Sequence, residues 1–442
     1  MVVKMKETVI QFGEGNFLRA FFDWFLDGLN KKGLYEGKAV IVQPRASGRV
    51  APLNEQGCKY NLYLRGIEDG QVKEEHSFIE SVSRCIDPYK NFEDYLALAE
   101  NPDFRFIVSN TTEAGIEFDP TCKLSDTPCK SFPGKLTQLL YKRYQNGLKG
   151  FIVLPCELID NNGNELKKCV LKYAELWDLE KEFFEWVEKE NTFANTLVDR
   201  IVTGYPDDET VSLHPEDKYL DTGELFHLWV IEGNFENELP LKKAGYNVVW
   251  TNDVTPYKKI KVRILNGAHT SMVTGALLSG IETVGECMVD KTVNAFLNKA
   301  VNEEILRTIG DNEESQAFAK AVFDRFKNPY IKHQLRSIAL NSVSKFSVRV
   351  LPTIFEYKKQ NGSYPKLLIM SLAYLIYFYK NDTPDDGETV VEIMKNNTIE
   401  DILCNKALWG EDVSDVVEAV KLSYEKIENL GAKGAMEWIL SE

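Results

Sequence analysis

The sequence predicts an α/β protein, with a Rossmann-like dinucleotide-binding domain over residues 1–252 and a mostly α-helical domain over residues 253–442. The chain opens with a short apolar strand at Thr8–Gln11, a glycine turn and an amphipathic helix. Short apolar runs followed by polar loops recur through the first half. After about Thr255, long segments with helical spacing dominate and strand signals fade. A length of 442 residues also favours two cores over one.

The composition limits the class of protein. With 44% hydrophobic and 27% charged residues, the chain is typical of a globular protein. It has no run of eighteen apolar residues, and its first residues lack the apolar core of a signal peptide, so we expect a cytoplasmic protein without a membrane span. The net charge of −15 argues against nucleic acid as a partner. An anionic substrate would therefore need local cations to hold it.

The cysteines and histidines show no metal-binding spacing. The eight cysteines form no Cys-x-x-Cys, and the chain has only five histidines. We therefore expect reduced thiols and no metal. Chemistry on an alcohol would then need a side-chain base, and lysine is the obvious candidate.

The glycine turn after the first strand resembles part of the dinucleotide fingerprint. Gly13 and Gly15 fit its first two glycines, although Leu18 stands where the third would be. A strand, glycine turn and helix together present backbone N–H groups to a pyrophosphate. We expect Gly13, Gly15 and Asn16 to contact a dinucleotide. Arg19, one helical turn further on, could reach a phosphate or be solvated.

Two later strands carry the remaining expected cofactor contacts. Ala39–Gln43 is followed by Arg45, where an acidic residue that grips the adenosine ribose would be expected. The sequence therefore leaves the choice between NAD and NADP open. Phe104–Val108 leads into a polar loop that contains Thr112 and Glu113. Because ligands bind beyond the carboxyl ends of strands in open α/β sheets, we expect both residues to contact the cofactor.

The segment Lys261–Thr270 brings together three groups suited to exchanging a proton with an alcohol or ketone. In an α-helix Asn266 lies about 140° around from Lys261, and His269 falls between them. A lysine among apolar residues can act as a base, a carboxamide can donate to a developing oxyanion, and a histidine can orient a hydroxyl. The alternative is an amphipathic helix whose polar face carries these residues.

A basic stretch lies in the helical half. It runs over Arg325–Gln334 and continues at Asn341–Arg349, and in an acidic protein such a local excess of cations suits a substrate that bears a carboxylate. The alternative is a solvated helix face.

The spacing Lys-x-x-x-x-Asn-x-x-His resembles the signature of the polyol-specific long-chain dehydrogenases, the mannitol dehydrogenase family. More closely, six blocks are similar to the uronate reductases of that family: Gln11–Ala20, Ser109–Ile116, Pro155–Asp160, Leu197–Pro206, Leu265–Thr270 and Asn328–Pro352. The resemblance implies a metal-independent enzyme that uses NAD to interconvert tagaturonate and altronate.

The resemblance also implies roles for individual residues. Lys261 would be the general acid/base, Asn266 would stabilise the oxyanion and His269 would hold the substrate. Asp199 would orient the substrate or the lysine.

The carboxylate of the substrate would meet two cations. Lys345 stands where the family places a cationic substrate contact, and Arg349, four residues on, could share its helical face. One position differs from the polyol enzymes. Where mannitol dehydrogenases carry a second asparagine that stabilises the oxyanion, this chain has Leu158. A second donor would come from Asn161 or Asn162, or be absent, and the leucine favours a substrate derived from a hexuronate.

Other functions stay open at this point. Fructuronate reductase and mannitol or other polyol dehydrogenases are alternatives within the family. Tyr257 and Lys261 also form the Tyr-x-x-x-Lys pair of short-chain dehydrogenases. A more distant alternative is a non-catalytic sensor of a dinucleotide and a sugar acid. The sequence does not predict an oligomeric state.

Overall fold

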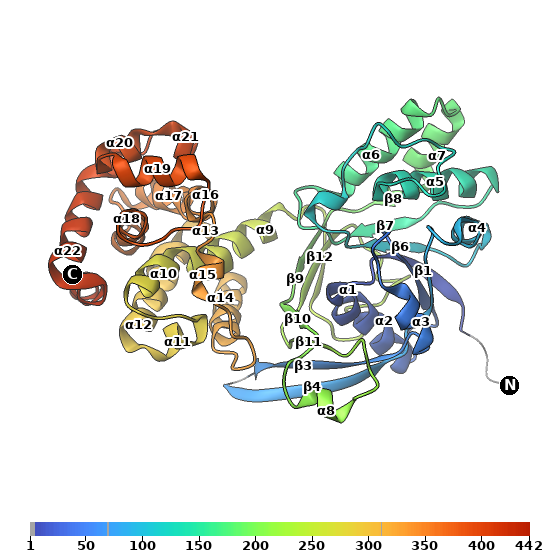
Figure 1. The fold of residues 1–442 in the computed structure, drawn as a ribbon, viewed down its shortest axis with the longest axis horizontal. Coiled ribbons are helices and arrows are strands. Elements are labelled where there is room, and N and C mark those ends of the chain that lie inside the picture. Colours follow the sequence, from blue (N-terminus) through green and yellow to red (C-terminus); the bar gives the residue numbers. More distant parts are fainter. Residues whose placement is uncertain (1–4, 69, 311) are drawn as a thin grey trace. The chain divides into compact units, whose positions relative to one another are not determined.

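The structure is a computed structural model that describes residues 5–68, 70–310 and 312–442. It divides into two compact units (Figure 1). The first unit contains residues up to Val254 except for 66–72. The second contains Thr255–Glu442 together with the described residues of Gly66–Val72. In the described residues, no helix is both long and apolar enough to cross a membrane.

A parallel six-stranded sheet forms the centre of the first unit, in the order β5-β2-β1-β6-β7-β8. Its strands are β1 (Glu7–Phe12), β2 (Lys38–Val42), β5 (Val82–Ile86), β6 (Phe106–Ser109), β7 (Ile152–Pro155) and β8 (Thr192–Phe193). The strands β2, β6 and β7 are mostly apolar because both faces of a parallel sheet are covered. The strand order reverses between β1 and β6, so the loops after these two strands meet at the position where such sheets bind ligands. The predicted α/β fold class is confirmed.

Alternate residues of β1 supply the two cores of this unit. Val9 contacts a cluster built with α1 (Asn16–Ala20) and α2 (Phe22–Lys31). Ile10 belongs to the cluster on the other face, where the helices are α5 (Phe132–Gln145), α6 (Asn162–Leu176) and α7 (Lys181–Glu190). The two groups of helices lie on opposite sides of the sheet (Figure 1). The amphipathic helix predicted after the glycine turn is divided into α1 and α2 at Phe21, where φ and ψ are −122° and −79°.

Two smaller sheets extend the first unit. One has the order β10-β11-β3-β4 and the other β13-β12-β9. Their strands are β3 (Tyr60–Glu68), β4 (Gln71–Ile79), β9 (Thr196–Asp199), β10 (Val202–Gly204), β11 (Asp221–Glu224), β12 (Leu228–Glu232) and β13 (Val248–Thr251). The sequence predicts β12 and β13 approximately, but not β3, β4 or β5. The short helices of this unit are α3 (Val50–Glu55), α4 (Phe92–Ala97) and α8 (Thr210–Leu213).

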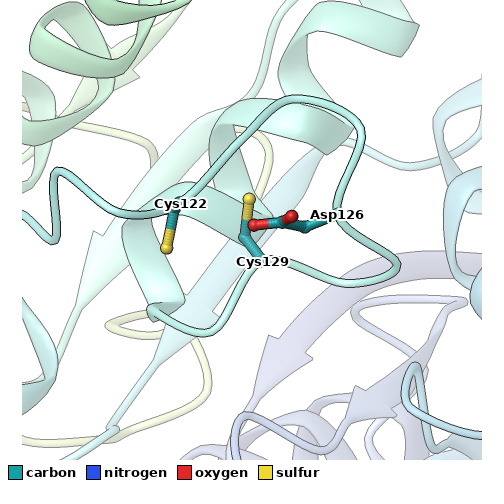
Figure 2. A group of neighbouring side chains, drawn as sticks. All are labelled: Cys122, Asp126 and Cys129. Atoms are coloured by element: carbon teal, nitrogen blue, oxygen red, sulfur yellow. The ribbon is translucent and has the colours of Figure 1, made fainter.

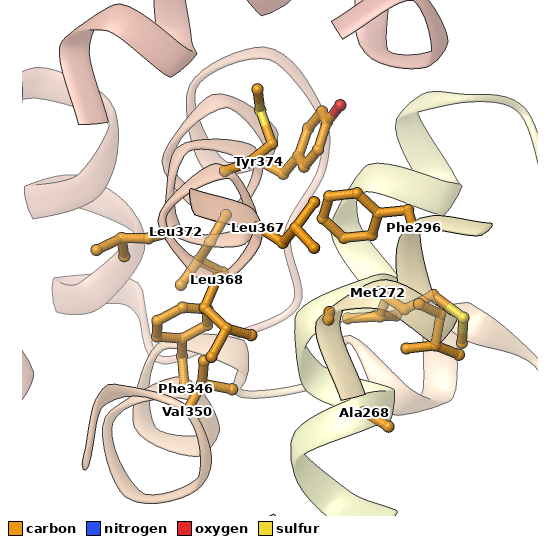
Figure 3. Close-up of a cluster of buried hydrophobic side chains, with 14 of the residues drawn as sticks. Ala268, Met272, Phe296, Phe346, Val350, Leu367, Leu368, Leu372 and Tyr374 are labelled. Atoms are coloured by element: carbon orange, nitrogen blue, oxygen red, sulfur yellow. The ribbon is translucent and has the colours of Figure 1, made fainter. Parts of the chain in front are cut away.

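The second unit is helical and is built around α18 (Lys366–Asn381), which packs against α10 (Gly267–Leu278) and α22 (Val417–Ser441). Figure 3 shows Leu367 and Tyr374 of α18 beside Phe296 from a neighbouring helix. The remaining helices are α9 (Thr255–Lys261), α11 (Val284–Val289), α12 (Lys291–Lys299), α13 (Leu306–Ile309), α14 (Glu313–Phe326), α15 (Leu335–Ile338), α16 (Ser342–Arg349), α17 (Leu351–Asn361), α19 (Glu388–Asn396), α20 (Ile399–Cys404) and α21 (Lys406–Trp409).

A buried carboxylate caps the N-terminus of the central helix, α18. Glu304 accepts hydrogen bonds at 2.9 Å from the backbone N–H groups of both Leu367 and Leu368. Burial raises the pKa of Glu304 to about 7. Its folded-state pKa therefore exceeds its unfolded value, and the folded state binds more protons between them.

We expect the stability contribution of Glu304 to fall as pH rises from about 4.5 to about 7, by about 3 kcal/mol for a shift of this size. The free energy of unfolding in urea, measured across this pH range, should show the decrease in the native chain and a smaller decrease in Glu304→Gln. If the free energy of unfolding depends on pH equally in the two proteins, Glu304 is not the group responsible.

Candidate functional site

The turn after β1 requires glycine at its first position. Gly13 has a φ of +126°, and a Cβ there would lie 2.8 Å from the carbonyl oxygen of Asn110. Its N–H donates to the carbonyl of Val42 at 3.2 Å. Gly15, which precedes α1, has ordinary dihedral angles and open space around its Cβ position. The backbone at Gly15 can therefore be approached closely by a ligand.

Arg19 does not face this open space. Its guanidinium lies 3.4 Å from Asp221, donates to the carbonyl of Tyr219 and to Oδ1 of Asn16, and stacks near the Tyr60 ring. The side chain is 4% exposed. Asp221, whose pKa burial raises to about 7, is the counter-charge within this buried network. These contacts give Arg19 a structural role, and the proposed cofactor site does not include it. Asn16 is exposed beside the turn.

A pocket of about 560 Å³ opens beyond the ends of β2 and β6, and its lining includes Pro44, Arg45, Thr111, Thr112, Lys130 and Ser131. Thr112 has a φ of +80°, which is a rare conformation for a β-branched residue. Such conformations persist where the surrounding structure enforces them, often at ligand sites. Glu113 follows in a short helical turn, and its side chain lies outside the described structure.

A buried acid holds the Thr112 loop in place, and the sequence analysis did not identify it. Glu157, after β7, accepts hydrogen bonds from the Ser109 hydroxyl at 3.0 Å and from the Thr111 hydroxyl and N–H at 2.9 and 3.0 Å. Burial raises its pKa, and these hydrogen bonds oppose the shift. Glu157 stood in a predicted loop, but nothing in its local sequence indicated that three donors from the neighbouring strand converge on it.

In the second unit, the segment Lys261–Thr270 is not a uniform α-helix. α9 ends at Lys261, residues Val262–Asn266 form a π-helical turn, and α10 starts at Gly267. The N–H of Gly267 bonds to the carbonyl of Val262, five residues back. With i→i+5 winding, Lys261 and Asn266 lie closer together around the helix axis than the about 140° that a uniform α-helix would give. The two side chains are half-buried.

His269 is buried and has an unsatisfied ring nitrogen. Its ring stacks on Phe326 with centroids 4.2 Å apart and meets His333 edge-on at 5.2 Å. Its Nε2 has no hydrogen-bond partner among the described residues. Burial holds the pKa of His269 well below its usual range, and the positive charges of Arg325, Arg349 and Lys345 add to this effect. The imidazole is therefore neutral and has a site for one more hydrogen bond.

Two cations of the basic stretch lie in the surroundings of His269, on α16. Lys345 donates to the carbonyl of Ile338 at 3.0 Å, and Arg349 donates weakly to the hydroxyl of Thr270 at 3.5 Å. In the described structure neither forms an ion pair with a carboxylate. Burial lowers the pKa of both groups. In contrast, Arg336, which lies between the two parts of this stretch, is exposed and paired with Asp382.

The other predicted residues belong to the first unit. Asp199 ends β9 and is 5% exposed, opposite Leu228 of β12. Leu158 is 59% exposed. Asn162 donates to the carbonyls of Pro155, Glu157 and Thr196 at 3.0–3.1 Å. Because its amide is fully used in the fold, Asn162 cannot also serve an oxyanion. Asn161 is exposed.

Both units match known protein families. Residues 7–243 match the mannitol dehydrogenase Rossmann domain, and residues 253–428 match the mannitol dehydrogenase C-terminal domain. The chain belongs to the mannitol dehydrogenase family. The short-chain alternative built on Tyr257 and Lys261 is therefore wrong.

Relatives in this family are similar over almost the whole chain. The altronate oxidoreductase of Bacillus subtilis is 44% identical, covering 98% of this chain and 95% of the relative. The altronate oxidoreductase of Phocaeicola vulgatus is 40% identical, covering 98% and 97%.

Solved structures of the mannitol dehydrogenase family share the fold. A D-sorbitol dehydrogenase in substrate-free form has a TM-score of 0.86 at 23% identity, covering 98% of this chain and 95% of that chain. The mannitol 2-dehydrogenase of Pseudomonas fluorescens, in a complex with NAD and D-mannitol, has a TM-score of 0.74 at 22% identity, covering 100% and 96%.

Proposed function

We propose that this chain is an NAD-dependent oxidoreductase that interconverts tagaturonate and altronate. The full-length relatives named altronate oxidoreductase support the reaction. The observation that carries the assignment is in the second unit. There the unsatisfied Nε2 of neutral His269 lies among cations, and Lys345 and Arg349 have no carboxylate partner in the described structure. This arrangement suits a substrate with both hydroxyl and carboxylate groups.

The first unit has the features that a dinucleotide needs. The backbone at Gly13 and Gly15 would receive the pyrophosphate, with Asn16 beside it. The 560 Å³ pocket, lined by Arg45 and Thr112 among others, would take the adenosine half. The expected contact from Glu113 belongs to the same loop. When bound, NADH supplies the hydride for the ketone.

The residues of the π-helical segment would handle the proton. In the reducing direction Lys261 gives a proton to the ketone oxygen as negative charge develops there, and Asn266 donates a hydrogen bond to the same oxygen. His269 orients a substrate hydroxyl through its unsatisfied nitrogen. In the oxidising direction Lys261 accepts the proton. We keep Asp199 as a residue that orients the substrate or Lys261.

The substrate's carboxylate would be held by Lys345 and Arg349, which also overcomes the unfavourable net charge of −15. Leu158 adds no polar group where the polyol enzymes have an asparagine, which fits a substrate oriented by its carboxylate. We also propose a cytoplasmic location, because all eight cysteines are free.

Initial rates with different acceptors test this function. NADH and NADPH oxidation would be followed separately with tagaturonate, fructuronate and fructose. We expect the highest kcat/KM with tagaturonate and NADH. A preference for fructuronate would indicate a fructuronate reductase. A preference for fructose would show that Lys345 and Arg349 do not select a substrate with a carboxylate. Lack of NADH oxidation with all three would refute the enzyme assignment.

The two glycines of the turn give a matched pair of variants. Gly13→Ala forces a Cβ against the carbonyl of Asn110 at a positive φ, so we expect a loss of about 1–3 kcal/mol in stability. Gly15→Ala meets open space, so its melting temperature should be nearly unchanged while NADH binding weakens. Thermal melts and fluorescence titration with NADH measure both. Unchanged NADH affinity in folded Gly15→Ala would contradict the proposed pyrophosphate site.

A further inference from the structure

Three potential metal ligands come together in the loop between residue 115 and α5. They are Cys122, Asp126 and Cys129, and their ligand atoms all lie within 4.8 Å of one another. Figure 2 shows the two sulfur atoms and the carboxylate gathered at one end of this loop. Cys122 is 3% exposed and Cys129 is fully buried. The separations fit a single tetrahedral ion, whose thiolate and carboxylate ligands bind at about 2.0–2.3 Å.

The fold itself holds these ligands in position. Gln138 of α5 accepts from the N–H of Cys129 at 3.2 Å and donates to the carbonyls of Leu124 and Asp126 at 3.0 and 2.7 Å. The Trp177 indole donates to the carbonyl of Cys122 at 3.0 Å. Because both ends of the loop are anchored, an ion would meet a largely preorganised site.

A buried ammonium next to the loop supplies a second, independent observation. Lys135 is fully buried, and its Nζ donates to the carbonyls of Lys130 and Ser131 at 2.8 and 3.4 Å. Among the described residues, no carboxylate pairs with it. Burial lowers its pKa to about 8, and Cys129 and Cys122 are the neighbours that act against this shift. A divalent ion bound by two thiolates and one carboxylate has a net charge of −1, which this ammonium would balance.

We propose that Cys122, Asp126 and Cys129 bind one zinc ion that braces this loop. Zinc binds both thiolate and carboxylate ligands in a tetrahedral arrangement, and two thiol protons leave when it binds. The fourth position belongs to a water molecule or to the carbonyl of Lys123, which lies 3.2 Å from Sγ of Cys129. The spacing Cys-x-x-x-Asp-x-x-Cys differs from the usual zinc motifs, so sequence analysis predicted no metal.

The zinc ion would have a structural role in the first unit. Residues Asp119, Pro120, Lys130 and Ser131 flank the proposed ligands and line the 560 Å³ pocket. Bracing the loop would therefore shape the wall of the proposed adenosine site. The ion takes no part in the proposed proton transfer, so zinc binding does not depend on the proposed reaction.

Metal analysis of the full-length protein, purified without chelators and supplied with zinc, tests the proposal. We expect about one zinc per chain, lost in Cys122→Ser/Cys129→Ser. The control is Cys58→Ser, which changes the other close cysteine pair, with sulfurs of Cys58 and Cys85 3.6 Å apart, and should keep the zinc. Cobalt in place of zinc should give cobalt–thiolate charge-transfer absorption in the native protein and the control.

A measurement on the native chain covers the case in which the double variant does not fold. Removing zinc with a chelator should lower the melting temperature, and adding zinc back should restore it. Three results would overturn the proposal: less than about a tenth of an equivalent of zinc bound, zinc retained in the folded double variant, or a disulfide between Cys122 and Cys129 in the native protein.

Discussion

Replacing Lys261 with alanine is expected to lower kcat for tagaturonate reduction by about 10²–10⁴-fold, the usual contribution of a general acid/base. Lys261 ends α9 next to the π-helical turn, which brings it closer to the helix face of Asn266 than a uniform α-helix would. Without the ammonium, the ketone oxygen must take its proton from water. Because the proposed cofactor site lies in the other unit, the affinity for NADH measured by fluorescence should change little.

The matched control for this prediction is Lys259→Ala. Lys259 belongs to the same helix but is exposed and paired with Glu356 at 3.1 Å. We expect near-native turnover from it. A small primary amine added to the Lys261→Ala enzyme should restore part of the rate, which a purely structural role would not allow. Near-native kcat in Lys261→Ala would remove the lysine from the mechanism.

Replacing Arg349 with glutamine is expected to raise KM for tagaturonate by about 30-fold, with a smaller change in kcat. The variant keeps a polar, though shorter, side chain but loses the charge that would meet the substrate's carboxylate. Loss of one such charge contact costs about 2 kcal/mol at the lower end of the usual range, which corresponds to this factor. A contact made equally in the ground and transition states changes KM more than kcat. Lys345→Met should act in the same direction.

Two comparisons show whether the effect depends on the carboxylate. Arg336→Gln removes an exposed cation between the two parts of the basic stretch, already paired with Asp382, and should leave KM unchanged. Any slow activity on fructose, which has no carboxylate, should be equal in native and Arg349→Gln enzymes. A KM increase of the same size for both substrates would instead assign Arg349 to the structure of the site.

Much of the first unit could be predicted from local sequence. Short, mainly apolar runs mark β1, β2, β6 and β7, because strands covered on both faces bury most of their side chains. β4 escaped prediction for the opposite reason. Most of its residues are exposed, so no buried pattern marks it, and its place is fixed by pairing in the small sheet.

In the candidate site, too, some features could be predicted from local sequence and others could not. The spacing of Lys261, Asn266 and His269 predicted the family, which the comparisons confirm, and the roles of the three residues stay a prediction. Their relative placement depends on a π-helical turn that the uniform 100° spacing does not contain. The position of Arg19 after the glycine turn suggested a phosphate contact. In the structure it pairs in the core with Asp221, which lies about two hundred residues later in the chain.

The sequence by itself indicated the α/β character of the first part, the helical character of the second part and the types of reactive group, because periodicity and composition are local properties of the chain. Only the tertiary structure decided which of those groups are available to a ligand. Packing left Nε2 of His269 without a partner, surrounded Glu157 with three donors, and brought Cys122 and Cys129 together. Such groupings depend on contacts between distant segments, and those contacts form only when the whole core packs.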